Sequence, residues 1–246
     1  MLLHTLFDVL ALVAALAVYR WLPISGPQGS PQAAPHAAPQ PWQVHRLYIA
    51  SGSLGATAGA YIAGTANLWL SGIPGIARSV EGALAAAIIA IEILKVATGI
   101  RGSTGLRFVA PLSAAIAIGR IGCFLAGLDD MTYGTPTGLP WGVDFGDGVT
   151  RHPVQLYESL TMAAFLAVFV TLVRRGSEPV LRTGFYLFVG VYATQRFLWE
   201  FLKPYGTVIG PFNLFHLISV ALIAYALIFA RREAPRSCST LVRSSP

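Results

Sequence analysis

Long apolar stretches separated by short polar ones repeat along the whole chain. Each stretch approaches the length of about 20 residues that an α-helix needs to cross the hydrocarbon core of a bilayer. The pattern therefore predicts an all-α, polytopic integral membrane protein with seven transmembrane helices. The expected helices cover residues 3–22, 47–70, 80–98, 107–127, 155–173, 183–202 and 212–230.

The first apolar run could instead be a signal peptide. It has no basic segment in front of it and no clear cleavage site of small residues, and Arg20 follows it, which favours a retained helix. Residues 23–41 are rich in Pro and Ala, and we expect a flexible or polyproline-like loop there. Residues 231–246 are expected to form a basic cytoplasmic tail, so that the whole chain is a single transmembrane domain.

Composition supports the membrane assignment. Of the 246 residues, 54% are hydrophobic and only 11% are charged, and the mean hydropathy is +0.62. Soluble domains carry about 25% charged residues. A net charge of +6 would suggest nucleic acid in a soluble protein, but here the basic residues lie mostly between apolar runs. We therefore expect no nucleic-acid partner, and the two cysteines, Cys123 and Cys238, predict no disulfide framework.

The basic residues are divided unequally between the two sides of the expected bundle. One side receives only Arg78, Arg151 and Lys203, and Arg120 and Arg196 lie inside helices. The other side receives twelve: Arg20, Arg46, Lys95, Arg101, Arg107, Arg174, Arg175, Arg182, Arg231, Arg232, Arg236 and Arg243. Because basic loops stay in the cytoplasm, we expect the N-terminus outside, the C-terminus in the cytoplasm and the 128–150 loop outside.

Charged residues inside the expected helices fall at one depth. Arg120 lies seven residues before Gly127 and Arg196 lies seven residues before Lys203, both at the outer boundary. This separation is roughly 10 Å at 1.5 Å per residue. Glu81 and Glu158 lie near the outer ends of two further helices. Charges within a membrane are costly and usually serve a function. The topology therefore predicts a functional site in the outer leaflet.

Several of these residues also have a structural interpretation. Arg120 could extend to the membrane surface, although Gly119 and Gly122 beside it favour close helix packing and an inward-facing side chain. Arg196 and Glu200 are four residues apart and could form a purely structural ion pair. His152, before Pro153, could simply orient the next helix.

Two further patterns predict packing or pairing inside the bundle. Glu92 and Lys95 are three residues apart and are expected to pair, and the glycines at 55 and 59 are expected to pack against another helix.

Four short motifs resemble those of one enzyme family. They are GRIG at 119–122, PWG at 140–142, RHPVQLYE at 151–158, and Arg196 followed by Glu200. Together they resemble the prolipoprotein diacylglyceryl transferase family over roughly residues 47–230. The resemblance implies a multi-pass enzyme of the bacterial inner membrane without cofactor or metal. It would move diacylglyceryl from phosphatidylglycerol, a membrane lipid, to the lipobox cysteine in the signal peptide of a prolipoprotein, releasing glycerol phosphate.

The candidate residues suit that chemistry. Arginine donates hydrogen bonds in a planar fork and keeps its charge when partly desolvated, so Arg120 and Arg196 are expected to clamp the lipid phosphate. Glycines would allow close approach of lipid and backbone. The catalytic candidates are Glu81, Arg120, Arg196 and His152. The candidates for binding phosphatidylglycerol are Arg120, Arg196, Gly119, Gly122, Gly134, Arg151, Gln155, Tyr157, Glu158 and Glu200.

The sequence departs from the family at two telling positions. The family usually has Ser-Phe-His-Gly-Gly where residues 79–83 read SVEGA, so Glu81 replaces a histidine, and Cys123 replaces the asparagine after GRIG. Glu81 could accept the thiol proton, with His152 as the competing base, or could simply pair with an arginine such as Arg78 or Arg120. The alternative function is a non-catalytic or differently selective phospholipid-binding membrane protein on the same scaffold. A transporter is less favoured because no internal repeat is found.

Overall fold

The computed structural model describes residues 2–22 and 41–233. The expected Pro/Ala-rich loop, apart from residue 41, and the tail beyond residue 233 lie outside these ranges. The described chain is all-α, as predicted, apart from a two-stranded hairpin. Its long helices are α1 (Leu2–Trp21), α2 (Pro41–Leu70), α3 (Val80–Thr98), α4 (Val109–Ala126), α5 (Val154–Arg174), α6 (Glu178–Glu200) and α7 (Leu214–Glu233).

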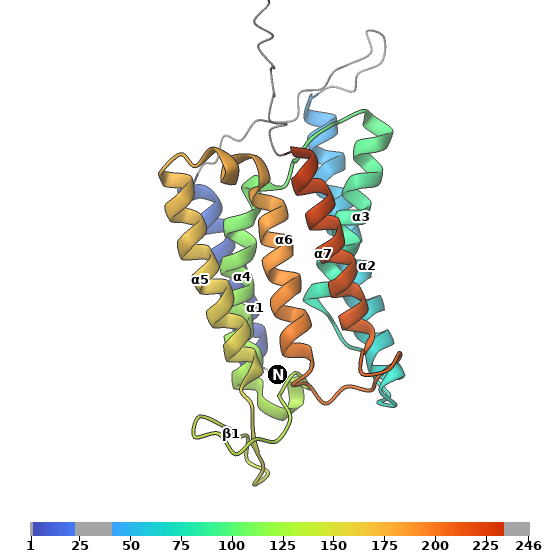
Figure 1. Cartoon of the computed structure of the whole chain (residues 1–246), viewed down its shortest axis with the longest axis vertical. Coiled ribbons are helices and arrows are strands. Elements are labelled where there is room, and N and C mark those ends of the chain that lie inside the picture. The colour runs from blue at the N-terminus through green and yellow to red at the C-terminus, as the bar shows by residue number, and fades with distance from the viewer. Residues whose placement is uncertain (1, 23–40, 234–246) are drawn as a thin grey trace, which may run out of the picture.

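Short elements join the long helices. The 3-10 helices η1 (Leu106–Phe108) and η2 (Gly127–Asp130) flank α4. Strands β1 (Val143–Asp144) and β2 (Thr150–Arg151) pair in antiparallel fashion between η2 and α5. The hairpin therefore lies at the end of the bundle where α4 ends and α5 begins (Figure 1).

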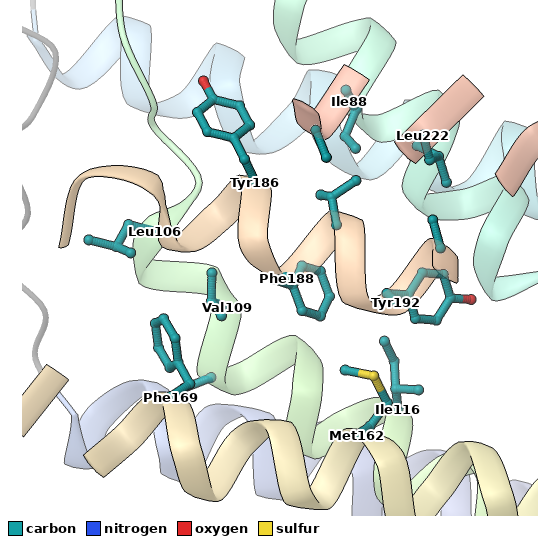
Figure 2. Close-up of a cluster of buried hydrophobic side chains, with 14 of the residues drawn as sticks. Ile88, Leu106, Val109, Ile116, Met162, Phe169, Tyr186, Phe188, Tyr192 and Leu222 are labelled. Carbon is teal, nitrogen blue, oxygen red and sulfur yellow. The ribbon is translucent and has the colours of Figure 1, made fainter. Parts of the chain in front are cut away.

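The long helices run up and down and pack as neighbouring pairs (Figure 1). Helix α1 packs on α4, α2 packs on α3, and α6 contacts both α5 and α7. Buried aromatic and aliphatic side chains from α4, α5 and α6 form the core, including Val109, Met162, Phe169, Phe188 and Tyr192 (Figure 2).

Small residues bring two of these pairs into close contact. A Cβ atom at Gly55 would lie 2.7 Å from the carbonyl oxygen of Ala86 and 2.9 Å from the Ala90 Cβ. The predicted packing role of this glycine on α2 is thereby confirmed. Gly122 similarly lets α4 approach α1, because a Cβ there would lie 3.0 Å from the Phe7 Cγ.

Three helices are long and apolar enough, by length and composition, to cross a membrane within the part of the chain that the structure describes. They cover Leu106–Asp130, Val154–Arg174 and Leu214–Glu233, and their mean hydropathies are 1.8, 1.9 and 2.0. Each is close to the roughly 20 residues that a spanning helix requires.

One end of the bundle collects the features that define the candidate site. There α4 and α6 end, whereas α3, α5 and α7 begin (Figure 1). Ser79 caps α3 because its hydroxyl accepts a 3.1 Å hydrogen bond from the Gly82 N–H. This cap sets the start of the helix and places Glu81 in its first turn.

Candidate functional site

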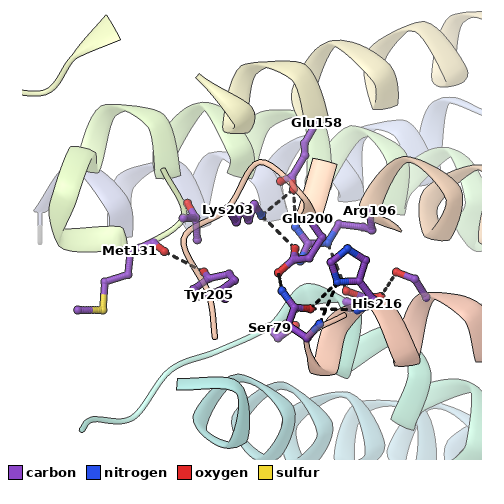
Figure 3. Close-up of polar contacts among 12 residues, drawn as sticks. Ser79, Met131, Glu158, Arg196, Glu200, Lys203, Tyr205 and His216 are labelled. Atoms are coloured by element: carbon purple, nitrogen blue, oxygen red, sulfur yellow. Dashed lines mark hydrogen bonds and ion pairs between the residues drawn. The ribbon is translucent and has the colours of Figure 1, made fainter. Parts of the chain in front are cut away.

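Glu158 of α5 is the centre of a buried ionic network at this end of the bundle (Figure 3). Its side chain is fully buried, and its Oε2 lies 2.5 Å from the Arg120 Nε of α4. Its Oε1 accepts hydrogen bonds from the Arg196 Nη1 of α6 and, at 2.8 Å, from the Lys203 Nζ that follows α6. One carboxylate thus gathers three cations from separate parts of the chain.

Arg196 contacts three carboxylates in return. Its Nε lies 3.3 Å from the Glu81 Oε2 and its Nη2 lies 2.8 Å from the Glu200 Oε2, in addition to the contact with Glu158. The predicted Arg196–Glu200 ion pair is therefore confirmed, but it is one part of a larger network. With Arg120 and Lys203 included, three positive side chains face three negative ones, so the buried charges balance.

Polar side chains around the network orient the carboxylates. The Ser219 hydroxyl of α7 donates a 2.5 Å hydrogen bond to the Glu81 Oε1, and the Asn213 Nδ2 donates a 3.0 Å hydrogen bond to the Glu200 Oε1. Asn213 in turn contacts His216 on the first turn of α7 (Figure 3). Both oxygens of Glu81 and both of Glu200 therefore have protein partners, which fixes these side chains in position.

The helical spacing explains why these residues converge. Arg196, Glu200 and Lys203 are separated by four and three residues, so they follow one face at the end of α6. The sequence predicts Lys203 as a charge in the loop after the helix, but its side chain is only 1% exposed. The spacing of Lys203 from Arg196 and Glu200 is the sequence pattern that could have added it to the site. No comparable pattern in the sequence indicates Asn213 or Ser219.

Two of the candidate residues lie in a separate polar group at the start of α5. The His152 Nδ1 lies 3.4 Å from the Tyr157 hydroxyl, which also accepts a 2.8 Å hydrogen bond from the Trp141 Nε1. Tyr157 also packs against Trp199, with ring centroids 5.2 Å apart. The side chains of His152 and Tyr157 thus contact each other and further aromatic residues.

Arg151 pairs within the hairpin. Its Nη1 and Nη2 each lie 2.7 Å from an Asp147 oxygen, which makes a bidentate contact. These hydrogen bonds hold the pKa of the Asp147 carboxyl below its ordinary value. Arg151 therefore stabilises the loop between β1 and β2.

The candidate glycines have different surroundings. The Gly134 N–H donates a 3.1 Å hydrogen bond to the His152 carbonyl, which ties the chain after η2 to the start of α5. At Gly119 no atom lies within 4 Å of the place where a Cβ would be, so this part of α4 has open space beside it. Gly122 contacts Phe7, as described above.

Several buried polar groups on α5 and α6 have no hydrogen-bond partner among the described residues. The side-chain amides of Gln155 and Gln195 and the hydroxyl of Tyr192 belong to this set. Buried amides and hydroxyls are normally hydrogen-bonded.

Cys123, in the position of the family's asparagine, places its Sγ 3.9 Å from the Arg120 Nη1.

Comparison with known proteins connects this site to one family. The profile described as prolipoprotein diacylglyceryl transferase matches residues 51–231. A phosphatidylglycerol–prolipoprotein diacylglyceryl transferase of Geobacter sulfurreducens is 35% identical over 121 residues, which is 47% of this chain and 45% of that protein. Its namesake in Finegoldia magna is 34% identical over 122 residues, covering 49% and 47% of the two chains. The matched part thus spans about half the length of these curated relatives, and no solved structure matches.

Proposed function

Because the chain belongs to the prolipoprotein diacylglyceryl transferase family, we propose that it is a transferase of lipoprotein maturation. It moves the diacylglyceryl group of phosphatidylglycerol to the lipobox cysteine thiol of a prolipoprotein. The observation that carries this proposal is the buried network of Glu81, Arg120, Glu158, Arg196 and Glu200. Every one of these residues lies within the stretch that matches the family, 51–231.

The chemistry requires an anion site and a base. The cysteine sulfur attacks the glyceryl carbon that carries the phosphate, so a carbon–sulfur bond forms while the carbon–oxygen bond to phosphate breaks. Glycerol phosphate leaves with the bonding electrons, and the thiol proton passes to a base. Positive groups fixed in a site of low polarity stabilise such a leaving group strongly.

Arg120, Arg196 and Lys203 supply the positive charge for the phosphate. Glu158 holds the two arginines side by side, one on each oxygen of its carboxylate. An arginine has five N–H donors, so each retains donors for a phosphate while bound to Glu158. Glu158 and Glu200 thus position the cations.

Glu81 is the proposed base, since it occupies the place of the family's histidine and lies inside the network. Both of its oxygens already accept hydrogen bonds, from Arg196 and Ser219. The proton therefore reaches Glu81 when one of these contacts opens, or through the Ser219 hydroxyl. His152 is the competing base.

The remaining candidates form the surroundings of the lipid. Gly119 leaves space beside Arg120, and the Gln155 amide lies one helical turn outward from Glu158 on α5. Tyr157, Arg151 and Gly134 hold the loop and the start of α5 next to this position.

The protein acts from within the bacterial inner membrane. We place all seven long helices across the bilayer, with the N-terminus outside and the C-terminus in the cytoplasm. The support is the uneven distribution of basic residues and the alternating direction of the helices. The ionic network then lies in the outer leaflet, where the thiol of an exported protein is available.

Complementation tests this function. A bacterium depleted of its own transferase would express the chain together with a reporter prolipoprotein, and mass spectrometry would search for thioether-linked diacylglycerol on the reporter cysteine. We expect lipidation of the reporter and none of a matched reporter with serine in place of that cysteine. Binding of phosphatidylglycerol to the purified protein, without lipidation of any reporter, would instead favour a non-catalytic phospholipid-binding protein on the same scaffold.

A further inference from the structure

A second feature, apart from the ionic network, is a cavity in the other half of the bundle. Its volume is about 290 Å³. Its walls come from α2, α3, the segment between α3 and η1, η1, α4, α6 and α7. They are mainly apolar, with Leu84, Ile88, Ile91, Phe108, Leu112 and Phe185 among them. A dry cavity of about 150 Å³ is enough to bind benzene, so this one has room for roughly a dozen carbon atoms.

The part of α3 that lines the cavity begins one helical turn after Glu81. Leu84 and Ile88, which line it, lie one and two turns after Glu81 on the same face of α3. From Leu84 to Lys95, the first and last residues of α3 that line the cavity, the axis of α3 rises roughly 16 Å at 1.5 Å per residue. One leaflet of the hydrocarbon core is about 15 Å thick. The cavity therefore has the length and the direction of a single acyl chain that descends from the network.

The far end of the cavity is polar and closed by internal contacts. The Lys95 Nζ lies 2.9 Å from the Glu92 Oε1, as the sequence predicted for this pair, and the Tyr225 hydroxyl donates a 2.9 Å hydrogen bond to the same oxygen. The hydroxyl groups of Tyr48 and Thr104 lie 3.0 Å apart and form a hydrogen bond at the same end of the cavity. An apolar chain that reached these groups would disrupt their hydrogen bonds without replacing them, which is costly.

We propose that this cavity takes one of the two acyl chains of the donor phospholipid and that the Glu92–Lys95–Tyr225 cluster limits the length of that chain. The proposal rests on the proposed function, because it assumes that the phosphate of the same lipid binds at the network. The second acyl chain lies outside the cavity, against the surrounding lipid. The cavity thus selects donors by the length of one chain.

Filling the cavity tests the proposal. Ala56 of α2 and Ala87 of α3 both line it, and Ala56→Leu or Ala87→Leu adds three carbon atoms to its wall. Each methylene group that loses its place in the cavity weakens binding about fourfold. We therefore expect either variant to discriminate against the longest accepted chain by roughly fiftyfold relative to the original protein. Donors about three carbons shorter should bind normally. Ala58→Leu, two residues along α2 at an exposed position, is the matched control.

The measurement is the chain-length distribution of phospholipid that co-purifies with each variant, read by mass spectrometry. This measurement does not depend on catalysis. A shift toward shorter acyl chains, in a protein that transfers no diacylglyceryl, would support the cavity proposal and reject the proposed transferase activity. Normal transfer by both variants with an unchanged distribution would overturn the cavity proposal and leave the activity intact. An equal shift in Ala58→Leu would also overturn it, because membrane thickness rather than the cavity would then set the length.

Mixed-chain phosphatidylglycerols sharpen the test. Two isomers are compared, each with one short and one long acyl chain placed at opposite glycerol positions. Ala56→Leu should bind one isomer more weakly than the other, because only the chain at one glycerol position enters the cavity. Equal sensitivity to both positions would contradict a cavity that holds a single chain.

Discussion

Arg196 contacts all three carboxylates of the network, and the chemistry of its guanidinium explains how. It contacts carboxylates from α3, α5 and its own helix. A guanidinium can serve three partners because its five donors point in different directions within one plane, whereas a lysine presents a single compact charge. Replacing Arg196 would leave several buried carboxylates short of a partner. Arg120, which contacts one carboxylate, is therefore the better probe of function.

We expect Arg120→Ala to lower the rate of diacylglyceryl transfer by about 10²–10³, the usual effect of removing one donor to a developing anion. Arg120→Lys should recover only part of this loss, because lysine keeps the charge but loses the planar fork. The measurement is the transfer rate in reconstituted vesicles, with thermal unfolding recorded for each variant. Arg182→Ala is the control, since Arg182 forms an exposed pair with Glu178 and should change stability by less than about 1 kcal/mol. Full activity in Arg120→Ala would remove this arginine from the mechanism.

The choice of base gives a second prediction at the same scale. Glu81→Gln keeps the shape and a carbonyl oxygen for Ser219 but cannot accept a proton. If Glu81 is the base, the rate should fall by about 10²–10⁴, while binding of phosphatidylglycerol stays close to normal. His152→Ala should then reduce the rate less, because His152 contacts Tyr157 and not the network.

The reverse pattern would move the assignment. Near-normal transfer by Glu81→Gln combined with loss of transfer in His152→Ala would make His152 the base. Normal transfer in both variants would show that neither residue is the base.

At residue scale, the sequence predicted which charges share a level but not which of them meet. Counting along helices gave Arg120 and Arg196 the same depth and placed Glu81 and Glu158 nearby. The structural interpretation of Glu81 was that it pairs with an arginine such as Arg78 or Arg120. Glu81 does pair with an arginine, but that residue is Arg196, and Arg78 lies 3.5 Å from Asp8. Depth follows from the rise per residue, whereas the partner depends on how the helices are rotated and which of them are neighbours.

At the scale of elements, apolar periodicity located every long helix of the described chain but misplaced some of their starts. Helix α6 begins at Glu178, five residues before the expected apolar run. Its first turn holds Glu178 and Pro179, which suit a helix N-terminus but are polar or cyclic. Helix α2 likewise begins at Pro41, before the expected start at 47. Hydrophobicity marks the segment that avoids water, and a helix can extend beyond it.

Two helical glycines predict opposite effects of the same substitution. Gly55→Ala should destabilise the protein by about 1–3 kcal/mol, because the added methyl group would meet the backbone of Ala86 and force α2 and α3 apart. Gly119→Ala should be neutral or stabilising by up to about 1 kcal/mol, because alanine favours the helix and space is free beside it. Unfolding in detergent measures both.

Gly119→Ala also tests the role of this glycine in lipid binding. A stable variant with weakened binding of phosphatidylglycerol would support close approach of the lipid to α4 at this position. Equal destabilisation by the two substitutions would contradict the packing argument for both.

At the scale of the whole molecule, the two ends of the bundle differ in charge and in chemistry. One end holds the hairpin (Figure 1) and the ionic network, and only three basic residues outside the helices lie there among the described residues: Arg78, Arg151 and Lys203. Lys203 is buried within the network, and Arg151 is paired with Asp147. The opposite end holds the ten basic residues of the larger set that lie among the described residues: Arg20, Arg46, Lys95, Arg101, Arg107, Arg174, Arg175, Arg182, Arg231 and Arg232. Arg107 and Arg174 there lie over the rings of Tyr19 and Trp21, at 4.9 and 4.2 Å from the ring centroids. Aromatic and basic residues together are typical of a helix end at the membrane surface.

This asymmetry predicts the orientation in the membrane, and cysteine labelling of intact cells measures it. After replacement of Cys123 and Cys238 by alanine, single cysteines are introduced by Gly138→Cys, in the exposed loop beside the hairpin, and by Ser244→Cys. A membrane-impermeant maleimide should label the first variant in intact cells. It should label the second only after the cells are opened, because the more basic side stays in the cytoplasm. Labelling of Ser244→Cys from outside, with Gly138→Cys protected, would invert the orientation. It would also place the ionic network in the inner leaflet, out of reach of the cysteine of an exported protein.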